Sequence, residues 1–95
     1  MQYLIIAYDY EDALERRLKV RDEHLKATKE LIKKGKIVEA GALLEDEKMV
    51  GSSLFVNFEN DEELDSWLEN EPYVVNKVWD LAQIQIVPVK LLPKN

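Results

Sequence analysis

Apolar and polar positions follow two periods along the chain, and the changes of period divide it into six predicted elements. Residues 2–8 form a short apolar run, which predicts a strand buried on both faces. From residue 12 to about residue 34 the apolar positions recur every three or four residues, which predicts a long helix. Asp12 with Glu15 forms a capping pair at its start, and Gly35 supplies a left-handed stop.

The remaining elements follow at short intervals. Residues 36–43 predict a second strand that ends near Gly41, and residues 51–59 predict a third strand. The two strands are expected to form a hairpin with a long loop, which contains the charged turn 45–48. Asn60 with Glu63 predicts the cap of a second helix, which Pro72 ends at or before Glu71. Residues 72–79 are then a loop or one short helical turn, and alternation from residue 82 predicts a final strand that ends near residue 88.

This order predicts a single α+β domain over residues 1–95, the ferredoxin-like βαββαβ arrangement with two helices on one face of a four-stranded antiparallel sheet. The other face would be too apolar for water and too polar for a simple core. We therefore expect a homodimer that covers it. The face under the helices is predicted to carry Leu54, Val56, Phe58, Ala82, Ile84 and Ile86, and the opposite face Ser53, Phe55, Asn57, Gln83 and Gln85.

On a helical wheel the predicted first helix presents an apolar stripe of Leu14, Leu18, Leu25 and Ile32. This stripe is expected to be buried against the core. Arg17 and Arg21 lie between the stripe and His24, which puts the only histidine at the edge of the buried face. A titratable group in that position can be partly desolvated and still be reached by a ligand.

Composition excludes several functional classes. The net charge of −6 disfavours binding to nucleic acids. The absence of cysteine excludes disulfides, thiolate catalysis and thiolate metal sites, and one histidine without a His/Cys cluster disfavours a transition-metal site. No metal and no cofactor are expected. The opening apolar run is too short for a membrane span and has no signal-peptide flank, so a cytoplasmic protein is expected.

His24 is the main candidate for chemistry, because an imidazole can take up and return a proton near neutral pH. A surface histidine at a helix edge is the alternative. Arg17 and Arg21 could hold an anionic substrate or pair with the many acidic side chains. Glu71, held by a proline at a helix end, could orient the imidazole or simply terminate the helix.

Ser52 and Tyr73 are further candidates, as hydrogen-bonding groups of a pocket. No nucleophile motif surrounds Ser52. Trp67 and Trp79 are most simply explained as core or interface aromatics.

Taken together, these ordered features resemble the YciI-like proteins, or YCII-related domains. The resemblance covers nearly the whole chain and combines individually weak pieces in a specific order. Its pieces are the run 3–9, Arg17-Leu18, Arg21 spaced from His24-Leu25 as Arg-x-x-His-Leu, Ala40-Gly41, Gly51-Ser52, Pro72-Tyr73-Val74 and the closing run 84–88.

The resemblance implies a dimeric α+β barrel type of fold and an active site of a histidine and an acid. His24 matches the family histidine, and Glu71 stands where the family has the aspartate of Asp-Pro-Tyr. Gly41-Ala42 stands where Gly-Pro is usual. One relative is similar to a dehydrochlorinase of a chlorinated hydroxylated aromatic compound.

Two functional hypotheses follow. In the first, the protein is a small cofactor-independent enzyme that transfers a proton on a small oxygenated cyclic or aromatic substrate, with His24 as base or acid and Glu71 orienting it. Arg21, with Arg17, would favour an anionic intermediate. In the second, the same pocket belongs to a non-catalytic metabolite-binding or regulatory dimer module. A small-molecule ligand is expected in both.

Overall fold

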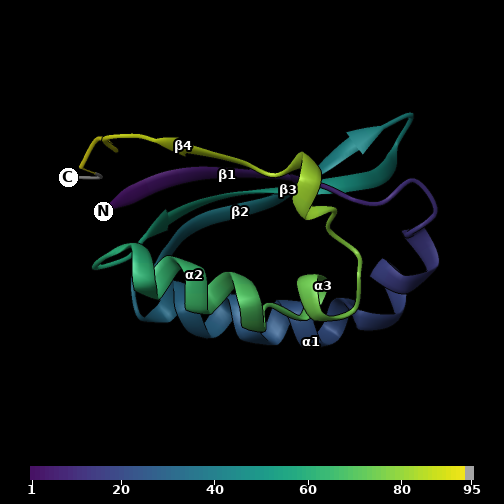
Figure 1. Ribbon diagram of the computed structural model, residues 1–95, viewed down its shortest axis with the longest axis horizontal. Helices are drawn as coiled ribbons and strands as arrows, with labels where there is room; N and C mark the ends of the chain where they lie inside the picture. The colour runs from purple at the N-terminus through teal and green to yellow at the C-terminus, as the bar shows by residue number, and fades with distance from the viewer. Residues whose placement is uncertain (94–95) are drawn as a thin grey trace.

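The computed structural model describes residues 1–93 and contains one four-stranded sheet with helices on one side (Figure 1). The elements follow the predicted order. After the second helix the chain forms the short helical turn that was one of the two predicted alternatives, and a 3₁₀ turn comes before the last strand. They are β1 (Gln2–Tyr8), α1 (Leu14–Lys33), β2 (Ile37–Glu45), β3 (Lys48–Asn57), α2 (Asp61–Asn70), α3 (Pro72–Val75), the 3₁₀ turn η1 (Leu81–Gln83) and β4 (Gln85–Pro88).

The sheet has the strand order β2-β3-β1-β4, and all its pairings are antiparallel. This is the ferredoxin-like topology that the sequence predicts. Figure 1 shows α1, α2 and α3 together below the sheet, and among residues 1–93 no element covers its other face. The strand β1 lies between β3, which pairs with it over residues 2–8, and β4, which pairs with it over residues 3–6.

The core lies between the helices and the inward side chains of the two central strands. In β1 the residues Tyr3, Ile5 and Ala7 are buried, and Ile5 pairs with the buried Leu54 of β3. This alternation confirms the predicted inward face of β3. The intervening Leu4 and Ile6 of β1 are only half-buried within one chain, because their face of the sheet has no helix over it.

Several local predictions are confirmed. Gly35 has a φ of +75° and ends α1 in the left-handed region. The Asn60 side chain accepts a hydrogen bond from the Glu63 backbone N–H at 2.9 Å and so caps α2. Pro72 starts the single turn α3, where its missing N–H and fixed φ are tolerated.

Three predictions about element ends are wrong. Asp12 does not cap α1, which has Ala13 as its N-cap and no side-chain cap. The β2–β3 connection is a tight turn with positive φ at Asp46 and Glu47, which matches the twist of a hairpin, and not a long loop. The last strand begins at Gln85, because Ala82 lies in η1, whose first turn is capped by the Asp80 side chain.

The predicted buried stripe of α1 is also wrong. Leu14, Leu18 and Ile32 are 37%, 55% and 43% exposed, and the buried positions are instead Arg17, His24 and Thr28. The wheel assumed that apolar residues face the core. Here the helix turns polar side chains inward, and two of them are neutralised by partners from distant segments, which offsets the cost of their burial.

Candidate functional site

His24 in the middle of α1 and Glu71 at the junction of α2 and α3 meet within one chain. The imidazole Nδ1 lies 2.7 Å from the Glu71 Oε1. Both groups are buried, with 8% of the His24 side chain and 1% of the Glu71 side chain exposed. The sequence left open whether these two residues meet in one subunit or across two, and the structure places them in the same one.

Local sequence fixes the Glu71 carboxylate. Pro72 disfavours helical geometry in the residue before it, and Glu71 accordingly has the extended values of φ −63° and ψ 127°. Its side chain turns back over α3, where Oε1 accepts the Tyr73 backbone N–H at 2.9 Å. The oxygen that contacts His24 is therefore held by a second donor, and its position does not depend on His24 alone.

This geometry selects one tautomer of the imidazole. A carboxylate only accepts hydrogen bonds, so Nδ1 of His24 carries a proton and donates the hydrogen bond to Glu71. In the neutral ring the lone pair then lies on Nε2, the nitrogen that does not contact Glu71. If Nε2 takes up a proton, the imidazolium of His24 lies beside the buried carboxylate of Glu71, which stabilises the positive charge, as in a histidine–carboxylate pair of a general base.

Aromatic rings pack against the imidazole. The Tyr73 ring stacks on His24 with the centroids 3.9 Å apart and an interplanar angle of 11°, and Trp79 meets it edge-on at 5.8 Å. Burial raises the pKa of the Tyr73 phenol, and the positive charges of Arg17 and Arg21 offset part of this rise. Tyr73 is therefore a neutral hydroxyl group near pH 7, able to donate a hydrogen bond.

Arg17 is buried and most of its donors are already used. Its Nε and Nη2 bind the two carboxylate oxygens of Asp9 at 2.7 and 3.1 Å, and Nη2 also donates to the Ser52 Oγ at 2.7 Å. The guanidinium lies 4.6 Å from the centre of the Tyr73 ring. Trp79 Nε1 donates to the same Ser52 oxygen at 3.1 Å. The sequence pattern does not assign Asp9 or Trp79 to this network.

These side chains surround a cavity of about 180 Å³, here called the site cavity. It lies between α1 and the strands β2 and β3. Its inner part is buried, whereas Arg21 and residues 40–42 are exposed and form its rim. Five of the six predicted site residues line it, and the sixth, Glu71, lies behind His24. Its full lining is Arg17, Arg21, His24, Leu25, Thr28, Ala40, Gly41, Ala42, Met49, Ser52, Leu54 and Tyr73.

Thr28 is a lining residue that the sequence analysis did not single out. It is 4% exposed and lies one helical turn after His24, so the two side chains share a face of α1. The spacing of four residues from the candidate histidine is the signal that could have found it.

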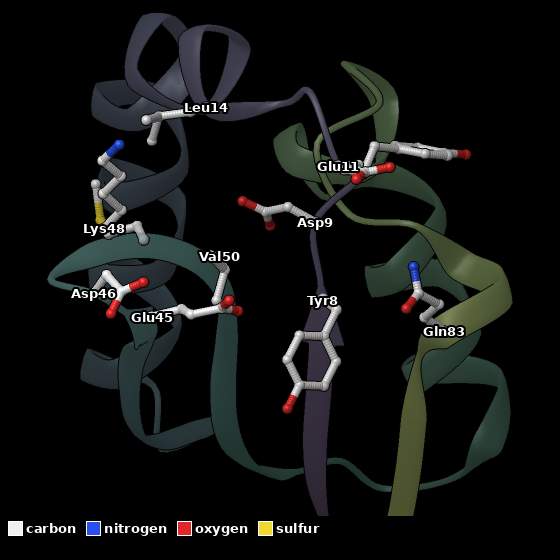
Figure 2. A pocket seen from close by; sticks show the side chains of 11 residues that line it. Tyr8, Asp9, Glu11, Leu14, Glu45, Asp46, Lys48, Val50 and Gln83 are labelled. Atoms are coloured by element: carbon white, nitrogen blue, oxygen red, sulfur yellow. The ribbon is translucent and has the colours of Figure 1, made fainter.

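A second, wider recess of about 700 Å³ lies at the end of the sheet where β1 leads into α1 (Figure 2). Four carboxylates line it, from Asp9, Glu11, Glu45 and Asp46, together with Lys48 as its one lining lysine. His24 and Glu71 do not contribute to it. Asp9 connects the two hollows, because it lines this acidic recess and binds Arg17, which lines the site cavity.

Within residues 1–93, no group of three or more histidine, aspartate or glutamate side chains is arranged to hold a metal ion. In the same part of the chain, every helix is too short or too polar to cross a bilayer.

Fold and site together define a small ferredoxin-like α+β domain in which a histidine that contacts a buried carboxylate lines a cavity. Comparison with known proteins identifies the class, since the YCII-related domain family matches residues 1–90. The chain belongs to this family. It is 33% identical to an uncharacterised protein of Haemophilus influenzae, and the alignment covers 95% of this chain and 97% of the relative. It is 31% identical to protein YciI of Escherichia coli, and that alignment covers 90% of this chain and 94% of the relative.

A solved structure has the same fold. It is the 5-chloro-2-hydroxyhydroquinone dehydrochlorinase TftG of Burkholderia phenoliruptrix in complex with 2,5-dihydroxybenzoquinone. The TM-score is 0.81 at 27% identity, and the alignment covers 95% of this chain and 94% of TftG. The resemblance to a small-molecule enzyme fold therefore extends over nearly the whole domain.

Proposed function

We propose that this protein is a small-molecule enzyme that moves a proton on a small oxygenated ring compound, with His24 as the proton-transferring group. The observation that carries the proposal is the buried contact of 2.7 Å between His24 and Glu71 beside a cavity. A buried imidazole with one nitrogen fixed by a carboxylate and the other facing a ligand site has the features of a general base. The similarity to TftG, which acts on a chlorinated hydroxyhydroquinone, supports the substrate class.

In the proposed reaction, Nε2 of His24 takes a proton from the ligand and the electron pair of the broken bond stays on the ligand as an enolate or phenolate. Glu71 stabilises the imidazolium that forms, because it already accepts the Nδ1 proton. Arg21 at the rim and the neutral hydroxyl of Tyr73 face the developing negative charge. The proton then returns from Nε2 to another position of the ligand. On a chlorinated ligand the electron pair instead expels chloride and the proton passes from Nε2 to water, so either course regenerates the base.

Arg17 has a positioning role in this proposal. Its guanidinium N–H groups donate hydrogen bonds to Asp9 and Ser52, which fixes the position of its positive charge. The same bonds hold Ser52 at the inner wall of the cavity. Arg21 is exposed at the rim and is the arginine better placed to contact an anionic ligand. Ser52 accepts two hydrogen bonds, which leaves its own proton for a ligand oxygen.

We also infer that two chains associate through the face of the sheet that has no helix over it. Leu4, Ile6 and Phe55 lie there half-buried, and Val87 is 40% exposed, so association would remove a contiguous apolar surface from water. Analytical ultracentrifugation at micromolar concentration should give twice the mass of one chain. A single-chain mass that persists at high concentration would contradict this inference.

The proton transfer can be measured with 2,5-dihydroxybenzoquinone, the ligand of TftG, as exchange of its ring hydrogens for solvent deuterium followed by NMR. The wild type should accelerate the exchange, and His24→Gln should lower the acceleration by about 10²-fold or more. Glu71→Gln should retain the fold and lose part of the rate. Glu23→Gln, an exposed acid next to His24, is the matched control and should exchange like the wild type.

The same samples should be tested with 5-chloro-2-hydroxyhydroquinone for release of chloride. An exchange rate that His24→Gln leaves unchanged would refute the assignment of the base. A ligand that binds and stabilises the protein without exchange or conversion would favour the metabolite-binding module instead.

A further inference from the structure

Met49 in β3 lies where the site cavity and the acidic recess meet. Among residues 1–93 it is the one residue that lines both hollows. The ion pair of Asp9 with Arg17 also joins a residue of the recess to a residue of the cavity. The wall between the two hollows therefore consists of this ion pair and the half-buried side chain of Met49.

A β-bulge turns Met49 toward this wall. The buried residues of β3 are the even-numbered ones over 52–56, so strict alternation would put Met49 on the open face of the sheet. The pairing with β2 shifts just before this point, since Leu43 pairs with Gly51 whereas Leu44 pairs with Met49. One extra residue of β3 lies between these two pairs, and Met49 lines the cavity together with inward side chains of the strand. Bulges of this kind re-aim a side chain and are frequent beside functional sites.

The two parts of the wall differ in how firmly they are held. Arg17 donates to both carboxylate oxygens of Asp9 and to Ser52, so the guanidinium is fixed. The contact of Met49 with the same guanidinium is weak, because Nη1 lies 4.0 Å from the thioether sulfur. A methionine side chain is unbranched and adapts to its neighbours. The length of this one side chain therefore sets where the cavity ends on the side of the recess.

The volumes of the two hollows show what this wall controls. The site cavity of about 180 Å³ is close in size to an engineered apolar cavity of about 150 Å³ that holds one benzene molecule. The recess beyond Met49 has a volume of about 700 Å³. One six-membered ring thus fills the cavity, and a shorter side chain at position 49 would join the cavity to a space with room for a second ring.

We propose that Met49 determines the size of the ligand: it closes the site cavity toward the acidic recess and restricts binding to compounds with a single ring. This assignment rests on the proposed function for the place of the ligand in the site cavity. It adds a residue that selects the substrate by ring number, through a wall that the bulge of β3 puts in place.

Titration calorimetry with catechol and 2,3-dihydroxynaphthalene tests the proposal, because the two probes carry the same oxygen atoms and differ by one fused ring. A site with room for the fused ring gains apolar contact area and binds the naphthalene more tightly. The wild type should bind the naphthalene no more tightly than catechol. Met49→Ala should bind the naphthalene about tenfold or more tightly than catechol, and catechol itself somewhat more weakly than the wild type does.

Three further variants separate the wall from general packing. Met49→Leu keeps a side chain of similar volume and should keep the selectivity of the wild type. Met49→Val shortens the side chain with a residue that suits a strand, so it should shift the selectivity in the same direction as Met49→Ala if the alanine variant is unstable. Val50→Ala is the matched control, because Val50 lines the recess and not the cavity, and its selectivity should equal that of the wild type.

A wild type that already binds the naphthalene about tenfold more tightly than catechol would overturn the proposal. A Met49→Ala variant without a gain for the naphthalene would overturn it too, including the case in which neither probe binds. If Met49→Ala weakened both probes by the same factor, Met49 would be a packing residue and not a selective one. The titration needs no turnover, so a shift of selectivity in a protein that catalyses no exchange would refute the proton transfer and leave the role of Met49 standing.

Discussion

Asp9→Asn tests whether the buried ion pair with Arg17 supports the site. The two side chains are 3% and 5% exposed and share two hydrogen bonds of 2.7 and 3.1 Å. Asparagine keeps the shape, removes the negative charge and leaves the guanidinium buried without an anion. Removing one partner of a buried pair costs about 3–5 kcal/mol. A domain of this size has a total stability of about 5–14 kcal/mol, so the expected loss is a large fraction of the total.

Urea unfolding followed by tryptophan fluorescence measures this loss, since Trp79 donates to the Ser52 oxygen that Arg17 also binds. A loss of about 3 kcal/mol should also lower the Tm by about 12 °C. Protein concentration must be equal in all samples, because association of chains would add to the apparent stability.

Asp12→Asn is the matched control. Asp12 faces Arg16 at 3.5 Å, and 87% of its side chain is exposed, so its loss should change the free energy of unfolding by less than about 0.5 kcal/mol. The double variant Asp9→Leu with Arg17→Met should be more stable than Asp9→Asn, because no charge is left buried. If Asp9→Asn lost less than about 1 kcal/mol, or the double variant were the less stable one, the buried-charge reasoning would be wrong.

Two further predictions concern packing and titration. Gly51→Ala should destabilise the fold by about 1–3 kcal/mol, because a Cβ there would lie 2.6 Å from the Ala7 carbonyl oxygen of the neighbouring strand. Gly41→Ala is the control: a Cβ at Gly41 meets nothing within 4 Å, so this variant should be nearly neutral in the same urea titration. Burial raises the pKa of Tyr73 above its ordinary value of 10.0. Above pH 10.0 the phenol therefore ionises in the unfolded chain before it ionises in the folded one, which favours the unfolded state. The wild type should accordingly lose stability relative to Tyr73→Phe as the pH rises above 10.0. A stability difference that stays constant from about pH 8 to about pH 11 would contradict the second prediction.

The sequence by itself determined the topology and the identity of the main candidates. Period-2 alternation in β3 correctly assigned Leu54 and Val56 to the core, and Asn60 and Gly35 correctly marked helix ends. These signals are local, because a strand's alternation, a cap or a left-handed glycine depends on neighbours within a few residues. His24 and Glu71 are candidates from the residues themselves, and the resemblance to the family indicates the same pair.

Only the tertiary structure decided which face of α1 is buried and what lies behind it. The periodicity favoured the leucine stripe, yet Arg17, His24 and Thr28 are the buried positions of the helix. Burial of Arg17 and His24 depends on Asp9 and Glu71, which are separated from them by 8 and 47 positions in the sequence. Pairing over such distances leaves no periodic trace. The fold could therefore be predicted from local patterns, whereas the geometry of the site arises from contacts that exist only once the chain has folded.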